Sequence, residues 1–252
     1  MTASLHKPHL QKPDFNITAN GDCALDIRFS AEPSEELSRY IIGLRQYIQE
    51  QGPDDLIDLI PAYQCLTISF DPLTHESESL SQELRALTQK YLKIPAKLDR
   101  DSRIIRIPVC YEEAFAPDMH MLSEHTGLTP KQVARLHTDT AYLVHMLGFS
   151  PGFLYLGGLD PRLHCPRKEK PRLRVPAGAV GIGGNQTGIY PQATAGGWQI
   201  IGQTPLRLFQ PSSDSPFIAE PLDIVKFYSI GKSEFETIAQ QAQYESAKER
   251  PI

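Results

Sequence analysis

Glycine and proline interrupt the chain about every ten residues between positions 140 and 230, and the segments between them are short and apolar. Such segments are too short for ordinary helices, whereas strands of ~5–6 residues joined by turns fit the spacing. The pattern therefore predicts an all-β sandwich or barrel. The interruptions include Ser150-Pro151-Gly152, Pro176-Ala177-Gly178, Gly196-Gly197 and Pro211.

The first part of the chain has a different pattern. Apolar and polar residues alternate around 27–29, as in a strand, and apolar residues recur at helical spacing over 37–48 and again over 80–91. Two short apolar runs, 56–60 and 65–70, lie between the helical segments and predict paired strands. The order strand, strand, helix, strand, strand, helix is typical of a small α+β domain.

A charged stretch at 97–103 separates the two patterns. We therefore predict a loose leader over 1–13, an N-terminal α+β domain over 14–98, a second domain built as a β sandwich or barrel over 99–232, and a polar C-terminal tail, helical or frayed, over 233–252. One helix is expected inside the second domain. It begins at Thr129, which can cap it, with Pro130 in the first turn and Gln132 placed for a capping box.

The composition excludes several classes of protein. Hydrophobic residues make up 40% of the 252 residues, which is too many for a disordered chain. The net charge of −5 argues against nucleic acid or an anionic membrane as a partner, because both attract clustered lysine and arginine. No apolar run approaches the ~20 residues of a membrane helix, and residues 1–13 lack the apolar segment of a secretory signal. A cytoplasmic globular protein is predicted.

The four cysteines, at positions 23, 65, 110 and 165, show no CxxC spacing, so they predict buried reduced thiols rather than a zinc site. No HExxH or paired-histidine pattern occurs either, and no metal site is predicted. Ser150 lies in a literal Gly-x-Ser-x-Gly string, but Pro151-Gly152 cannot continue into the helix that a nucleophile elbow needs. A serine hydrolase is therefore not favoured.

Glycines are concentrated between Gly178 and Gly188. Glycine is useful where the backbone must approach a ligand closely, but tight turns between barrel strands explain such a run equally well. The dinucleotide fingerprint fails because Gln186 stands where glycine is needed, and the P-loop fails because Ile189-Tyr190 replaces Lys-Ser or Lys-Thr. What remains is a glycine-lined loop with polar side chains, preceded by two arginines, Arg172 and Arg174, able to contact an anion.

Several long blocks of the sequence form a recognisable pattern. They are Met146 to Phe153, Val175 to Pro191, Gly196 to Gly202, Gly21-Asp22, Pro61-Ala62-Tyr63, Ile107 to Tyr111 and Leu136-His137-Thr138. Together these blocks resemble the 5-oxoprolinase B-subunit family, also called KipI-type or allophanate hydrolase subunit 1. The resemblance covers about residues 15–230.

The resemblance implies a small α+β domain followed by a cyclophilin-like β-barrel. It also implies a complex with 5-oxoprolinase subunits A and C that opens 5-oxoproline to glutamate while hydrolysing ATP. ATP would then be a co-substrate of the complex, with Mg²⁺ possible beside it, and this chain is not expected to bind a cofactor of its own.

Within this resemblance we predict Arg174 and Gln186 as catalytic residues. Arg174 would neutralise developing negative charge, and Gln186 would orient the lactam amide or carboxylate. The predicted substrate-binding residues are Phe149, Phe153, Pro176, Gly178, Gly183, Gly184, Thr187 and Tyr190.

Two alternatives stay open. One is a KipI-type inhibitor that binds a sensor histidine kinase, and the other is a carboxyltransferase-like component acting on urea or allophanate. The chain has no Met-Lys dipeptide for biotin attachment. It departs from the family pattern at Leu154, where proline is usual, at Asn185, and at Leu222, where the usual Pro-Gly-Asp turn reads Pro-Leu-Asp.

Overall fold

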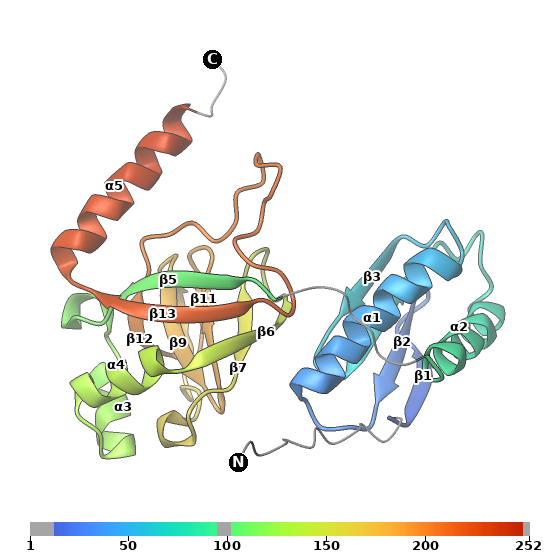
Figure 1. The fold of residues 1–252 in the computed structure, drawn as a ribbon, viewed down its shortest axis with the longest axis horizontal. Coiled ribbons are helices and arrows are strands. Elements are labelled where there is room, and N and C mark those ends of the chain that lie inside the picture. Colours follow the sequence, from blue (N-terminus) through green and yellow to red (C-terminus); the bar gives the residue numbers. More distant parts are fainter. Residues whose placement is uncertain (1–12, 95–101, 249–252) are drawn as a thin grey trace, which may run out of the picture. The chain divides into compact units, whose positions relative to one another are not determined.

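The computed structural model describes residues 13–94 and 102–248 and divides the chain into two compact units, Met1–Arg100 and Asp101–Ile252 (Figure 1). Nearly all of the predicted leader and the predicted boundary between residues 98 and 99 lie outside the described residues. Each unit is described by itself.

The first unit is an antiparallel four-stranded sheet in the order β1-β2-β4-β3, accompanied by two helices. The elements follow the predicted order strand, strand, helix, strand, strand, helix. They are β1 (Phe15–Ala19), β2 (Ala24–Phe29), α1 (Glu35–Gln51), β3 (Asp58–Pro61), β4 (Cys65–Ser69) and α2 (Ser77–Tyr91).

Helix α1 shows why these residues adopt these elements. The Ser34 hydroxyl accepts a hydrogen bond from the Leu37 amide at 3.1 Å and caps the helix, and the Gly52 amide closes its end on the Ile48 carbonyl at 2.8 Å. Leu37, Leu44 and Ile48 share one face and are fully buried in the core of this unit.

The second unit contains a closed barrel in the strand order β10-β7-β6-β13-β5-β12-β9 (Figure 1). A parallel pair, β5 and β13, joins otherwise antiparallel neighbours. The strands are β5 (Ile104–Cys110), β6 (Ala141–Leu147), β7 (Leu154–Gly157), β9 (Ala179–Gly183), β10 (Gln186–Ile189), β12 (Gln199–Gln203) and β13 (Ile224–Ile230). The predicted α+β fold with a β-barrel is thus confirmed.

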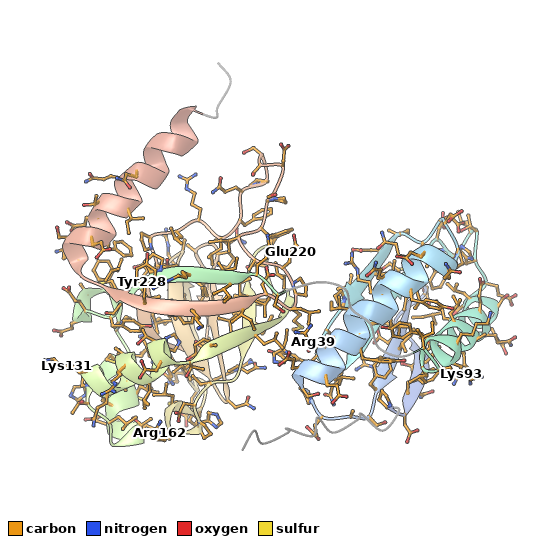
Figure 2. All side chains as sticks on the ribbon, in the orientation of Figure 1. Arg39, Lys93, Lys131, Arg162, Glu220 and Tyr228 are labelled. Carbon is orange, nitrogen blue, oxygen red and sulfur yellow. The ribbon has the colours of Figure 1, made fainter. Side chains whose placement is uncertain are left out.

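Helices and a two-stranded ribbon lie outside the barrel. Helix α3 packs against β12 and α4 against β13, and Lys131 in the first turn of α4 points away from the barrel (Figure 2). The predicted capping box of Thr129 and Gln132 is present, whereas α3 was not predicted. These elements are η1 (Glu113–Phe115), α3 (Met119–Thr126), α4 (Pro130–Asp139), η2 (Pro161–Leu163), the ribbon of β8 (Arg172–Val175) with β11 (Thr194–Gly196), and α5 (Lys232–Lys248).

A series of hydrogen-bonded polar side chains crosses the barrel core. The Thr187 hydroxyl donates to the Gly181 carbonyl at 3.0 Å, so it must accept from His137 Nε2 at 2.9 Å, because it has a single proton. His137 Nδ1 then accepts from the Tyr111 hydroxyl at 2.7 Å. Burial lowers the pKa of His137 to about 3, and the ring is therefore neutral.

The thiols follow the prediction at three of four positions. Cys65, Cys110 and Cys165 are buried and free, and burial raises the pKa of each. Cys23 is exposed, contrary to expectation, because it lies in the turn between β1 and β2. Within the described part of the chain, no helix is long and apolar enough to cross a membrane.

Candidate functional site

An aromatic cluster separate from the main barrel core lies where β7, β10 and β12 begin or end. Phe153 is at its centre, with ring centroids 4.8 Å from Tyr155, 5.2 Å from Tyr190 and 5.5 Å from both Phe149 and Trp198. Phe153 packs edge-to-face against Phe149, Tyr190 and Trp198 and at a tilt against Tyr155, and this packing fixes the positions of the rings. Phe153, Tyr190 and Trp198 are buried, whereas Phe149 is 63% exposed.

These rings form the wall of an open cavity of about 290 Å³. This volume is at the lower end of the ~300–1,000 Å³ typical of ligand pockets, so the cavity suits a small molecule. We call it the aromatic pocket. Its lining residues are Phe149, Phe153, Tyr155, Arg167, Lys168, Pro171, Tyr190, Ala195, Gly196, Gly197 and Trp198.

Glycines make room for these rings. A Cβ atom at Gly183 would lie 2.6 Å from the Trp198 indole, and one at Gly196 would lie 2.5 Å from the Tyr190 hydroxyl. Both distances are far below van der Waals contact. The rings therefore approach the backbone as closely as they do because these positions lack a side chain.

Phe149 has a positive φ of 64°, in the left-handed region that costs a non-glycine residue roughly 1–2 kcal/mol. Its ring packs edge-on against Phe153 and Tyr190. Strained, exposed aromatic residues of this kind gather at functional sites. Phe149 thus forms the solvent-facing edge of the aromatic pocket.

A buried carboxylate anchors the cationic side of the pocket. Asp118 accepts hydrogen bonds from Arg172 through both guanidinium Nη atoms, from Lys168 Nζ at 2.9 Å and from the Ile200 amide at 2.7 Å. Burial raises the pKa of Asp118, but these donors outweigh it and the pKa lies below its ordinary value. Asp118 is therefore ionised and holds segment 168–172 beside the barrel.

Arg167 differs from its neighbours. Its guanidinium carbon lies 5.7 Å from the centroid of the Trp198 ring, within cation–π range. Burial raises the pKa of Tyr155 and of Tyr190, and the positive charge of Arg167 lowers both in part. The field of Arg167 therefore reaches the hydroxyl groups of the aromatic pocket.

The structure brings together only some of the predicted site residues. Phe149, Phe153 and Tyr190 line the aromatic pocket. Arg174 is exposed on β8, Gln186 is half-buried at the start of β10, and Thr187 is used in the barrel core. None of these three lines the pocket, and neither do the remaining predicted residues, Pro176, Gly178, Gly183 and Gly184.

The glycine-rich segment is not the ligand-facing loop that the sequence suggested. Residues 179–183 and 186–189 are the paired strands β9 and β10, with Gly188 opposite Gly181, and Gly184 and Asn185 make the turn. Their backbone groups are used in the barrel ladder, so they are not free for an anion. The alternative of tight turns between barrel strands is the one observed.

Ser150 and the buried histidine His137 occupy structural positions rather than a catalytic arrangement. The residues after Ser150 turn directly into strand β7, so the helix of a nucleophile elbow is missing here. His137 is fully buried in the barrel. Among the residues that the structure describes, no group of three or more His, Cys, Asp or Glu side chains is placed to hold a metal ion.

Several residues of the site were not predicted as site residues. Trp198 is the single tryptophan of the chain and follows Gly196-Gly197, a signal that was available in the sequence. Tyr155 could also have been found from the sequence, because it lies two residues after Phe153. No sequence signal marked Asp118, Arg167 and Lys168, because they lie in turn and loop segments without a motif.

The sequence matches the carboxyltransferase domain, subdomain C and D, over residues 15–219. The B subunit of 5-oxoprolinase from Bacillus subtilis is 38% identical over 235 residues, 90% of this chain and 98% of that protein. The B subunit of 5-oxoprolinase from Escherichia coli O157:H7 is 45% identical over 173 residues, 69% of this chain and 78% of that protein.

Among solved structures, the urea carboxylase of Kluyveromyces lactis superposes with a TM-score of 0.77 over 91% of this chain and 23% of that one. At 20% identity this likeness shows the fold alone. The fold and the family match define a carboxyltransferase domain of the C and D type. Within that class, the chain belongs to the 5-oxoprolinase B-subunit family.

Proposed function

We propose that this chain is one subunit of a cytoplasmic, ATP-dependent 5-oxoprolinase complex, acting with subunits A and C to open 5-oxo-L-proline to L-glutamate. The observation that carries the proposal is the similarity to a 5-oxoprolinase B subunit over 98% of that protein's length, which includes both units of this chain. The similarity to urea carboxylase covers 23% of that chain at 20% identity and supports a shared fold rather than a shared substrate.

The chemistry requires activation, because a lactam resists attack by water. In the mechanism we propose, the lactam oxygen attacks the γ-phosphorus of ATP and ADP leaves. Water then adds to the ring carbon that carries the phosphorylated oxygen, and the carbon–nitrogen bond breaks with protonation of the nitrogen, which gives γ-glutamyl phosphate. Hydrolysis of this phosphate yields glutamate and inorganic phosphate. A protein assists such steps mainly by holding the ring and its charges in position.

The test is 5-oxoproline-dependent release of ADP and formation of glutamate, measured for this chain alone and after mixing with subunits A and C. Turnover only in the complete mixture is the expected result. A mixture without 5-oxoproline is the control for uncoupled ATP hydrolysis. Absence of turnover, with every subunit shown to be folded by circular dichroism, would overturn the proposal in favour of a binding protein such as a kinase inhibitor.

The predicted catalytic residues are part of this proposal. Gln186 and Arg174 lie outside the aromatic pocket, so a role in turnover would place them at a second surface that another subunit completes. Gln186→Ala in the assembled complex is expected to lower turnover. Unchanged turnover would remove Gln186 from the site.

A further inference from the structure

We propose that the aromatic pocket of this chain alone binds a small ring that bears a carboxylate, with Arg167 as the residue that selects the carboxylate. This inference rests on the proposed function, since 5-oxoproline is such a molecule, and it assigns the selection of the carboxylate to Arg167, a residue that the sequence did not indicate. Three features of the molecule support it: the shape of the pocket, its charge, and the state of Arg167.

The shape favours a flat, compact ligand. The rings of Phe153, Tyr190 and Trp198 hold one another edge-on at centroid distances of 5.2 to 6.4 Å and form a wall of the open 290 Å³ cavity. Phe149 closes the outer edge, held in a strained backbone conformation. A rigid aromatic wall gives large contact area to a small ring at little cost in conformational entropy.

The charge favours an anion. Two of the lining residues, Arg167 and Lys168, are cationic, and no carboxylate among the described residues lines the cavity. Lys168 and the nearby Arg172 both bond to Asp118. One carboxylate thus faces two cations, and the neighbourhood stays positive even before Arg167 is counted.

Arg167 is the cation left for a ligand. Among the described residues it has no carboxylate partner, and its guanidinium stacks on Trp198 at 5.7 Å. A stacked guanidinium keeps its N–H edge free, and that edge matches the two oxygens of a carboxylate. Because Arg167 stacks on Trp198, a carboxylate bound to Arg167 would lie beside the aromatic wall. One small molecule can therefore contact the guanidinium with its carboxylate and the wall with its ring.

Trp198 makes the inference directly measurable, because it is the only tryptophan of the chain and it lines the pocket. The intact chain is titrated with 5-oxo-L-proline and with 2-pyrrolidinone, the same ring without the carboxylate, while tryptophan emission is recorded. Isothermal titration calorimetry on the same samples registers any binding that leaves the emission unchanged. We expect 5-oxoproline to bind more tightly than 2-pyrrolidinone.

Arg167→Gln is expected to weaken 5-oxoproline binding by roughly 10- to 100-fold, the range for a lost charge-assisted pair, and to leave 2-pyrrolidinone binding within about twofold. The matched control is Arg135→Gln on α4, whose side chain is 81% exposed and lines no part of the pocket. Thermal melts of both variants establish that they fold.

Equal affinity for the two ligands in the parent chain, or equal 5-oxoproline affinity in Arg167→Gln and Arg135→Gln, would overturn the role of Arg167. Absence of 5-oxoproline binding by both methods would overturn the pocket assignment itself. If the assembled complex still turned over, the proposed function would stand and only this inference would fail. If 5-oxoproline bound to the chain but the assembled complex did not turn over, this inference would stand and the proposed function would fail.

Discussion

Asp118 and Arg172 are 54 positions apart in the chain and form a two-pronged ion pair, with Arg172 Nη2 at 2.7 Å from Asp118 Oδ1 and Nη1 bonded to Oδ2. Asp118 stands immediately before helix α3, and Arg172 begins strand β8. The pair therefore fastens a surface ribbon to the barrel, and it does so beside the aromatic pocket.

We expect Asp118→Asn to lower the free energy of unfolding by about 2 kcal/mol, because it removes a buried charge that several donors share and leaves two cations facing each other. Urea unfolding at pH 7 measures the change. Asp139→Asn is the control, since Asp139 is 63% exposed and pairs with Arg135 on the surface of α4. Equal loss in the two variants would contradict the anchoring role of Asp118.

The same carboxylate predicts a pH effect. Because its pKa is lowered in the folded chain, the stabilisation from Asp118 is complete above its unfolded value of ~3.9 and is lost as the pH falls through the folded value. The Asp118→Asn variant should therefore lose its difference from the parent chain only in strongly acidic solution. A difference that already disappears between pH 7 and pH 5 would exclude this explanation.

His137 should produce a different pH dependence. Its pKa is about 3 in the folded chain and ~6.5 when unfolded, so the unfolded chain takes up a proton first as the pH falls. We expect stability to fall below about pH 6.5, by ~1.4 kcal/mol for each pH unit from this group. Urea unfolding at pH 6.5, 5.5 and 4.5 measures the slope.

In His137→Gln this part of the slope should vanish, although the variant itself is less stable because it loses the imidazole ring that stacks on Phe227 with centroids 4.5 Å apart. His120→Gln is the matched control, because the His120 side chain is 87% exposed. If both variants kept the slope of the parent chain, another group would have to be its source.

Gly183→Ala tests the close approach of Trp198. The added methyl would lie 2.6 Å from the indole, so the ring must move, at a cost of about 1–3 kcal/mol. We expect a lower melting temperature together with a red-shifted tryptophan emission. Gly148→Ala serves as the control, since its nearest neighbour would be 3.7 Å away. Unchanged emission in Gly183→Ala would show that the ring does not sit as described.

The sequence predicted the parts of the fold that local chemistry decides. Turn residues at regular spacing predicted a β sandwich or barrel, the family resemblance favoured the barrel, and the apolar spacing of 37–48 predicted α1. The family blocks supplied Phe149, Phe153 and Tyr190. The glycine-rich segment left two interpretations open, because glycine permits both a ligand loop and a strand packed under an aromatic ring. The pairing of β9 with β10 and the position of Trp198 decide between them.

The cationic side of the site was beyond prediction for a different reason. Asp118 binds Lys168 and Arg172, 50 and 54 positions away, and the hydrogen bonds that join them depend on how the barrel closes. Arg174, two residues from Arg172, looks equivalent in sequence but is exposed. Which arginine of the pair is anchored is a property of the β8–β11 register, not of the motif.

The capping box of α4 allows a local prediction to be tested quantitatively. The backbone amide of Gln132 donates to the Thr129 hydroxyl at 3.3 Å, and the side-chain oxygen of Gln132, Oε1, accepts from the backbone amide of Thr129 at 2.8 Å. We expect Thr129→Ala to destabilise the chain by about 1 kcal/mol, because it leaves an amide of the first turn without its acceptor. Thr138→Ala, near the end of the same helix, removes only a hydroxyl bonded to the Arg135 carbonyl and should change stability by less than about 0.5 kcal/mol. Urea unfolding of both variants decides the matter, since equal effects would mean that the box contributes no more than an ordinary surface threonine.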